Sequence, residues 1–161
     1  MDKDAIESSI IIDLFKEEYK LDFEALNLQW IKKYFRVEEE DRKILENPQS
    51  YVIDRGGQIF FAINDGKAIG TAAMVLVEER IFELSKMAVE PKFQGFGIGR
   101  RIIDECIKFA KQHEAHEIFL ITNDKLLPAL ELYRSSGFEL DENYDDNRYE
   151  RGNTKMKLSL R

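Results

Sequence analysis

The sequence has few of the residues that build disulfides, metal sites or membrane spans. Its single cysteine, Cys106, permits no internal disulfide and fits a reducing compartment. The two histidines, His113 and His116, lie in the polar stretch KQHEAHE with no other ligand candidates nearby, so we expect solvated side chains and no metal site. No apolar run is long enough to cross a bilayer, and the N-terminal MDKDAIESS lacks the layout of a signal peptide. We therefore expect a cytoplasmic protein without a membrane partner.

Basic residues are also in the minority, with 24 Lys and Arg against 31 Asp and Glu and a net charge of −7. Broad nucleic-acid binding depends on basic patches that neutralise phosphates, so this balance argues against a nucleic-acid partner. The hydrophobic content of 43% over 161 residues is that of a globular protein with a core of its own. Because no repeat or Pro/Gly-rich linker interrupts the chain, residues 1–161 are predicted to form a single domain.

The hydrophobic pattern changes along the chain from a run of strands to alternating strands and helices. Strands are predicted at 9–15, 57–65, 67–79, 79–91, 117–123, 138–140 and 153–160. Helices are predicted at 17–35, as one or two pieces, and at 37–47, 98–113 and 128–137. Loops are expected at 47–57 and 141–153. This order predicts an α/β fold, in which a mixed sheet with antiparallel N-terminal strands carries helices on both faces.

A glycine-rich stretch, KFQGFGIGRR at 92–101, separates a predicted strand from a predicted helix. Glycines at alternate positions let backbone N–H groups approach an anion at the positive end of the helix. Arg100 and Arg101 oppose the helix dipole in that first turn unless a phosphate or pyrophosphate is bound there. The alternative is a flexible turn with solvated arginines. A P-loop is excluded because no Gly-Lys-Ser/Thr follows, and Arg100 stands where a dinucleotide fingerprint needs its third glycine.

Four motifs in a fixed order resemble the GNAT family of N-acetyltransferases, over roughly residues 57–140. They are ELSKMAV (83–89), P-x-x-Q-G-x-G-x-G (91–99), an asparagine at a strand end (Asn123) and ALELYRSSGF (129–138). The resemblance implies that the glycine loop binds the pyrophosphate of coenzyme A and that acetyl-CoA is the acyl donor. The expected donors are the backbone amides of Gln94, Gly95, Phe96, Gly97, Ile98, Gly99 and Arg100.

The same resemblance assigns roles around the thioester. Strand 83–89 is expected to lie along the pantetheine, with a local splay or bulge that exposes the amides of Met87, Ala88 and Val89. Tyr133 matches the family tyrosine that protonates the departing thiolate. A phenol with a pKa near 10 is protonated at neutral pH and can donate to a thiolate whose conjugate acid has a pKa near 8.5. Its alternative is a plain core aromatic. Asn123 is expected either to bond the pantetheine amides or to cap the following loop.

The acceptor side of the site is less defined by sequence. Glu83 is the candidate general base, acting on an ammonium group through water, and its alternative is an ordinary surface or cross-strand charge. In the family the N-terminal region lines an acceptor pocket, so the resemblance implies that apolar residues of 17–35 line one here. The alternative is that they pack in the core, as aromatic residues at helical spacing usually do. They are Phe23, Leu28, Trp30, Ile31, Tyr34 and Phe35. The acidic run EEED at 38–41 is expected to be a solvated face.

Together these patterns predict an acyl-CoA-dependent N-acyltransferase. It would move an acetyl group from acetyl-CoA to a primary amine of a small molecule or peptide, by direct transfer in a ternary complex. One alternative is a non-catalytic acyl-CoA-binding sensor, which would need neither Tyr133 nor Glu83. Another is a nucleotide-binding protein of a different fold, which would prefer ATP or NAD to coenzyme A. The acceptor, the size of the acyl group, the identity of the base, homodimer formation and the role of 141–153 are left open.

Overall fold

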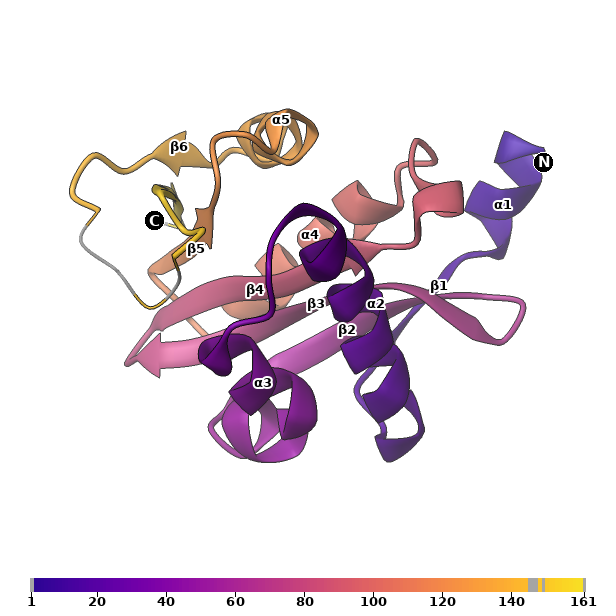
Figure 1. Cartoon of the computed structure of the whole chain (residues 1–161), viewed down its shortest axis with the longest axis horizontal. Helices are drawn as coiled ribbons and strands as arrows, with labels where there is room; N and C mark the ends of the chain where they lie inside the picture. The colour runs from indigo at the N-terminus through magenta and orange to yellow at the C-terminus, as the bar shows by residue number, and fades with distance from the viewer. Residues whose placement is uncertain (1, 145–147, 149, 161) are drawn as a thin grey trace.

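The computed structural model describes residues 2–144, 148 and 150–160. Within them lies one seven-stranded sheet with the strand order β1-β2-β3-β4-β5-β7-β6 (Figure 1). The strands are β1 (Ile11–Leu14), β2 (Gln58–Asn64), β3 (Lys67–Glu78), β4 (Ile81–Val89), β5 (Glu117–Thr122), β6 (Glu139–Leu140) and β7 (Thr154–Ser159). β4 and β5 run parallel, and the other neighbouring strands run antiparallel. The predicted mixed α/β sheet with antiparallel N-terminal strands is confirmed.

Helices cover both faces of this sheet (Figure 1). The α-helices are α1 (Lys3–Ser9), α2 (Lys20–Tyr34), α3 (Glu39–Glu46), α4 (Ile98–Gln112) and α5 (Leu127–Ser135). Shorter turns are the 3-10 helices η1 (Glu17–Tyr19) and η3 (Pro91–Phe93) and the π-helix η2 (Gln49–Ile53). The sequence predicted neither α1, which Asp2 caps through the N–H of Asp4, nor η2, which lies in the expected loop 47–57. None of the described helices combines the length and apolar character needed to cross a membrane.

Two hydrophobic cores form because successive strand residues point to opposite faces. On β2, Phe60 and Ala62 join the core that includes Ile102 of α4. Ile59 and Phe61 join the other core, which includes Phe23 of α2. α2 and α3 therefore cover one face and α4 covers the other, so both faces of the central strands are dry.

β4 contains the bulge that the sequence analysis expected. Ser85 lies opposite Ala73 and Ala88 lies opposite Thr71, so β4 has one more residue than β3 in this interval. Leu84 and Ala88 would share a face in a regular strand, yet Leu84 packs in the α4 core and Ala88 in the α2 core. Lys86, inside the bulge, has a φ of 51°, a left-handed conformation that costs a non-glycine residue on the order of 1 kcal/mol.

The sheet opens next to this bulge. β4 pairs with β5 only through Ile81, Phe82 and Glu83, opposite residues 117–119. β5 meanwhile continues alongside β7 as far as Thr122. Beyond Glu83 the two parallel strands therefore part, and the gap between them lies at the carboxyl end of both strands, where open α/β sheets bind ligands.

Candidate active site

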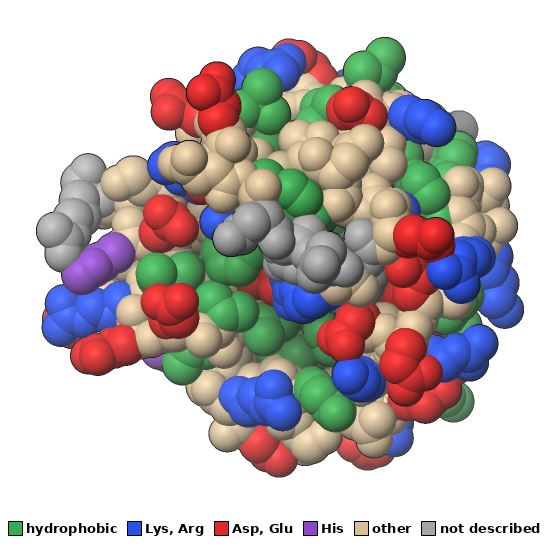
Figure 2. Space-filling model, turned by 60° about the vertical axis from the view of Figure 1, so that its left-hand side comes forward, with side chains coloured by type: hydrophobic (Ala, Val, Ile, Leu, Met, Phe, Trp, Pro, Cys, Tyr) green, Lys and Arg blue, Asp and Glu red, His purple; other side chains and the backbone are tan. Residues whose placement is uncertain are grey.

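The gap between β4 and β5 contains a cavity of about 190 Å³. Its walls come from residues 83–87 of β4, 120–123 at the end of β5, Tyr133 on α5, and Trp30 and Tyr34 on α2. Arg151 and Gly152 close one side. Figure 2 shows the side of the molecule on which β5 and β6 lie, with hydrophobic side chains gathered below and to the left of the centre and acidic and basic side chains interspersed around them. The site thus combines an apolar slot with a few polar groups, as small-molecule sites do.

The glycine loop leads into α4 next to this cavity. Gly95 has a φ of 88° and Gly97 a φ of 74°, both in the left-handed region that favours glycine. Gly97 is the N-cap of α4, and the N–H of Arg101 donates to its carbonyl at 3.2 Å. The N–H groups of the first turn, on residues 98–100, therefore have no partner inside the helix and face outward at its positive end.

The loop is also open enough for a pyrophosphate. A Cβ placed on Gly95 or Gly97 would meet no described atom within 4 Å, so the backbone there is exposed on that side. Gly99 differs, because its Cβ would lie 3.0 Å from Leu132 Cδ2 and 3.2 Å from Met87 Cε. Gly99 thus serves the close packing of α4 against α5 and β4. The bare backbone and helix terminus fit the diphosphate that the sequence analysis assigned to this loop.

Gln94 departs from the expected set of donors. Its N–H donates to the carbonyl of Pro91 at 3.2 Å, and its side-chain Nε2 donates to the carbonyl of Val89 at 3.1 Å. Gln94 therefore ties the end of β4 to the start of the loop. Its amide is committed to this turn, so the expected donors begin at Gly95.

The positive charge of the loop has partners within the protein. Arg101 donates to the carbonyls of Glu7 and Ile10, both at 3.2 Å, and so satisfies the C-terminal end of α1. Arg100 pairs with Asp104 one turn along α4 at 3.2 Å. The sequence offered a bound anion or solvation for the two arginines. Arg101 instead binds the end of helix α1, which the sequence did not predict and which supplies its acceptors.

Tyr133 faces the cavity from α5. Its ring packs edge-on against Phe138, with centroids 6.2 Å apart, and burial raises the pKa of Tyr133 to about 12. Its hydroxyl has no hydrogen-bond partner among the described residues. The phenol thus stays protonated at physiological pH and is available to a ligand in the cavity, which is more than a plain core aromatic would offer.

Glu83 is the last β4 residue that pairs with β5, and it reaches the same cavity. The residue is only 4% exposed, and its Oε2 accepts a hydrogen bond from Arg148 Nη2 at 2.9 Å. Glu83 is therefore not an ordinary surface charge. This buried carboxylate lies beside the opening of the sheet, within reach of a ligand in the cavity.

Asn123 takes the capping role that the sequence left open. Its Oδ1 accepts from the N–H of Lys125 at 2.8 Å, and its Nδ2 donates to the carbonyl of Arg151 at 2.7 Å. Both polar side-chain atoms therefore organise the loop after β5. Contact of Asn123 with pantetheine remains a prediction, and its side chain would have to exchange one of these bonds to make it.

The six residues of 17–35 divide between core and cavity. Phe23 and Ile31 are fully buried in the α2 core, and Leu28 and Phe35 do not line the cavity. Trp30 and Tyr34 do line it. Trp30 is held in place by a hydrogen bond from its Nε1 to Asn27 Oδ1 at 3.3 Å. The side of the cavity formed by α2 therefore has two aromatic walls.

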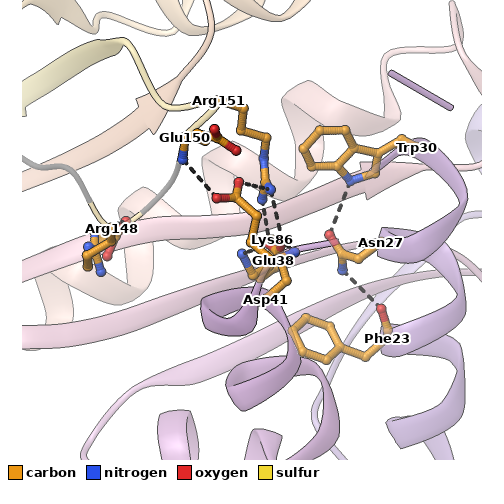
Figure 3. Close-up of polar contacts among 10 residues, drawn as sticks. Phe23, Asn27, Trp30, Glu38, Asp41, Lys86, Arg148, Glu150 and Arg151 are labelled. Atoms are coloured by element: carbon orange, nitrogen blue, oxygen red, sulfur yellow. Dashed lines mark hydrogen bonds and ion pairs between the residues drawn. The ribbon is translucent and has the colours of Figure 1, made fainter. Parts of the chain in front are cut away.

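A buried ion cluster, which the sequence did not predict, lies beside these walls (Figure 3). Asp41 is fully buried and accepts hydrogen bonds from Lys86 Nζ at 2.8 Å and from Arg151. Arg151 also donates to Glu38 at 3.0 Å. Burial opposes ionisation of Asp41, but the bonds from Arg151 and the charge of Lys86 outweigh it and lower the pKa of Asp41 to about 2. The expectation of a solvated face at 38–41 is thus wrong for Glu38 and Asp41.

Neither histidine lies in the cavity. His113 is exposed at the end of α4 and packs on Phe109, with ring centroids 4.1 Å apart, while His116 is half-buried next to Arg80. No group of three or more histidine, cysteine, aspartate or glutamate side chains in the described part of the chain is arranged to hold a metal ion. Cys106 is buried in the α4 core, and burial raises the pKa of its thiol.

Comparison with known proteins gives a consistent result. The sequence model of the acetyltransferase (GNAT) family matches residues 16–138. N-acetylaspartate synthetase of Rattus norvegicus is 32% identical over 91 residues, which are 56% of this chain and 30% of that protein. This chain thus spans less than a third of that relative's length.

Solved structures match over most of the chain. An acetyltransferase of the GNAT family from Staphylococcus aureus Mu50 has a TM-score of 0.86 at 24% identity and covers 94% of this chain and 99% of its own. A GNAT family acetyltransferase from Elizabethkingia anophelis with acetyl-CoA bound has a TM-score of 0.72 at 19% identity, over 94% and 99% of the two chains. Fold, loop and family match agree, and the chain belongs to the acetyltransferase (GNAT) family, whose members use acetyl-CoA.

Proposed function

We propose that residues 1–161 form one acyltransferase domain that moves an acetyl group from acetyl-CoA to a primary amine by direct transfer. The observation that carries this proposal is the convergence at one opening of the sheet. The bare loop leads from the end of β4 into α4, where Gly99 packs beside Met87 of the cavity wall, and the bulge of β4, the hydroxyl of Tyr133 and the carboxylate of Glu83 lie at the opening itself. A binding module would need only the first of these.

The donor half of the site has two anchors for acetyl-CoA. The outward N–H groups of residues 98–100 and the bare backbone of residues 95–97 are suited to the diphosphate, because they combine hydrogen bonds with the positive end of α4. The gap between β4 and β5 then receives the pantetheine arm. The bulge breaks the regular ladder around Lys86, so the amides of Met87, Ala88 and Val89 are the candidates to polarise the thioester carbonyl.

The reaction exchanges a C–S bond for a C–N bond. Acetyl-CoA supplies the activated acyl group, and the amine nitrogen must arrive uncharged. Glu83 takes the proton of the ammonium group, directly or through water, and Tyr133 donates its hydroxyl hydrogen bond to the leaving sulfur. The ammonium group loses two protons in all. The first passes through Glu83 to water, and the second, lost from nitrogen as the amide forms, ends on the sulfur, so the products are the N-acetylated amine, coenzyme A and one released proton.

Acceptors enter on the side of Trp30 and Tyr34. The two aromatic walls and the small cavity suit a small amine or an amino-acid-like amine. The name of the rat relative, N-acetylaspartate synthetase, points in the same direction, and the terminal or lysine amine of a peptide is the other class that the opening admits. We place this reaction in the cytoplasm.

The test is a panel of primary amines, with release of coenzyme A thiol as the readout. Saturable, acceptor-dependent release with equal formation of acetylated amine supports the proposal. Binding of acetyl-CoA without turnover of any amine, and without an effect of Tyr133→Phe, would instead identify a sensor. Tighter binding of ATP or NAD than of coenzyme A would identify a nucleotide-binding protein.

A further inference from the structure

The bulge of β4 is anchored to α3 by a buried ion pair. Lys86, which has the left-handed φ, sends its side chain out of the strand to Asp41, and their atoms Nζ and Oδ1 are 2.8 Å apart. The two side chains are 4% and 0% exposed. A residue in this strained conformation persists only where its surroundings hold it, and Asp41 binds the ammonium group of Lys86.

The same carboxylate holds two further elements. Its Oδ2 accepts from the N–H of Glu38 at 2.8 Å, which closes the capping box at the start of α3. Arg151 donates from Nη1 to Oδ2 at 2.9 Å and from Nη2 to Oδ1 (Figure 3). Asp41, near the start of α3, thus joins this helix to Lys86 of β4, 45 residues away in sequence, and to Arg151 before β7, 110 residues away.

Arg151 carries this connection to the remaining walls of the cavity. Its guanidinium carbon lies 5.7 Å from the ring centroid of Trp30, and its carbonyl accepts from Asn123 Nδ2 at 2.7 Å. Trp30 belongs to the acceptor wall and Asn123 to the end of β5. The walls from α2, β4 and β5 are therefore all connected to one carboxylate.

Stability alone is a weak reason for such a cluster. Desolvation of buried ions offsets much of their attraction, and apolar side chains of similar volume often stabilise a fold equally well. What the ions provide is a fixed geometry, because each hydrogen bond has a narrow range of distance and direction. The place where fixed geometry matters is the reacting centre next to Lys86.

From this arrangement, and resting on the proposed acetyl transfer, we propose that Asp41 is a positioning residue for the reaction. Through Lys86 it fixes the bulge amides against the thioester carbonyl, and through Arg151 it fixes the acceptor wall. Asp41 does not itself touch the reacting atoms. The glycine loop that holds the diphosphate lies outside the cluster.

Asp41→Asn tests this role, because it keeps the side-chain shape and removes the charge. A displacement of about 1 Å at a reacting centre costs about 100-fold in rate, so we expect kcat to fall by about 10- to 100-fold. The affinity for acetyl-CoA in calorimetry should stay within about 3-fold of the wild type, since the loop is untouched. Glu40→Gln is the matched control on the same helix. Glu40 pairs with Lys43 at the surface at 2.8 Å, so kcat should not change.

Lys86→Gly provides a second variant that does not depend on the folding of Asp41→Asn. Glycine accepts the left-handed φ without strain, so the variant should fold, yet it removes the anchor and should lower kcat to a similar extent. Glu114→Gly is its control, because Glu114 also has a positive φ, 56°, and lies exposed beyond α4. The double variant of Asp41→Asn with Lys86→Gly should be no slower than the slower single variant, since each substitution removes the same contact between Lys86 and Asp41.

The outcomes separate the two proposals. A wild-type chain that acetylates no amine overturns the proposed function, and the positioning role with it. An active wild type with unchanged kcat in folded Asp41→Asn or in Lys86→Gly overturns the positioning role alone. Equal losses of kcat and of acetyl-CoA affinity would also overturn it, because they would show general damage to the fold.

Discussion

Replacement of Tyr133 by phenylalanine removes one hydroxyl from the cavity and little else. The ring contact with Phe138 at 6.2 Å is kept, and no described residue loses a hydrogen-bond partner. The free energy of unfolding should therefore change by no more than about 0.5 kcal/mol. Any large effect on turnover must then come from the chemistry.

The raised pKa of Tyr133 indicates which kind of contribution its hydroxyl makes to the rate. With a pKa of about 12, the Tyr133 phenol is a weaker acid than a thiol of pKa near 8.5, so full proton transfer to the thiolate is uphill. Its contribution is a hydrogen bond to developing negative charge, worth about 1.5–3 kcal/mol. The loss should lower kcat by about 10- to 150-fold while acetyl-CoA affinity stays near that of the wild type.

The assay follows the thiol of coenzyme A with a colorimetric thiol reagent, at saturating acceptor. Cys106 does not interfere, because it is buried and its thiol has a raised pKa. Tyr51→Phe is the control, since Tyr51 lies on η2 outside the cavity and should keep full activity. Equal rates for Tyr133→Phe and the wild type would refute the reasoning. So would loss of activity in the wild type at pH 8–9 caused by ionisation of Tyr133, because a phenol with a pKa of about 12 stays protonated there.

Three further predictions concern the loop, the ion cluster and α1. Gly97→Ala should lower the free energy of unfolding by about 1–2 kcal/mol, because Gly97 has a φ of 74°. It should also weaken acetyl-CoA binding in calorimetry, and an unchanged affinity would contradict the assignment of the loop to the diphosphate. The pKa of Asp41 falls from 3.8 to about 2 on folding. Its charge therefore adds about 2 kcal/mol to the free energy of unfolding above pH 4, and this stabilisation is lost as the pH falls toward 2. In urea unfolding, the free energy of unfolding of Asp41→Asn should decrease less between pH 4 and pH 2 than that of the wild type. An equal decrease in both proteins would argue against the ion cluster. Arg101→Met should cost about 1–3 kcal/mol by freeing the end of α1 but leave acetyl-CoA affinity unchanged, and a marked loss of affinity would show that Arg101 binds the diphosphate.

The sequence was most informative where local pattern decides structure. Periodicity located the strands and long helices, and the glycines at 95 and 97 indicated a backbone that needs positive φ. The bulge in ELSKMAV was expected from the family resemblance rather than from the residues themselves. Its register shift and the switch of Leu84 and Ala88 to opposite faces confirm it.

Sequence reasoning was least informative where distant residues meet. Asp41 and Arg151 are 110 residues apart, and each stands in a polar stretch that looks solvated. The sequence contained one indication of the cluster. Lys86 is the single basic residue of β4 and stands at a position where the alternation of the strand predicts burial, and a buried charge requires a partner. The partner of Arg101 was hidden for a different reason. Helix α1 has seven residues, too few for a clear hydrophobic period.

The short pairing of β4 with β5 has a consequence for the free protein. Only three residues of each strand are joined there, so the half of the sheet formed by β5, β7 and β6 is attached to the rest by a narrow ladder. An extended arm inserted into the gap would act as a missing strand between the two halves. Amide hydrogens of β4 and β5 that point into the gap should therefore exchange quickly in the free protein and slow markedly when acetyl-CoA is added, which makes the ligand part of the sheet.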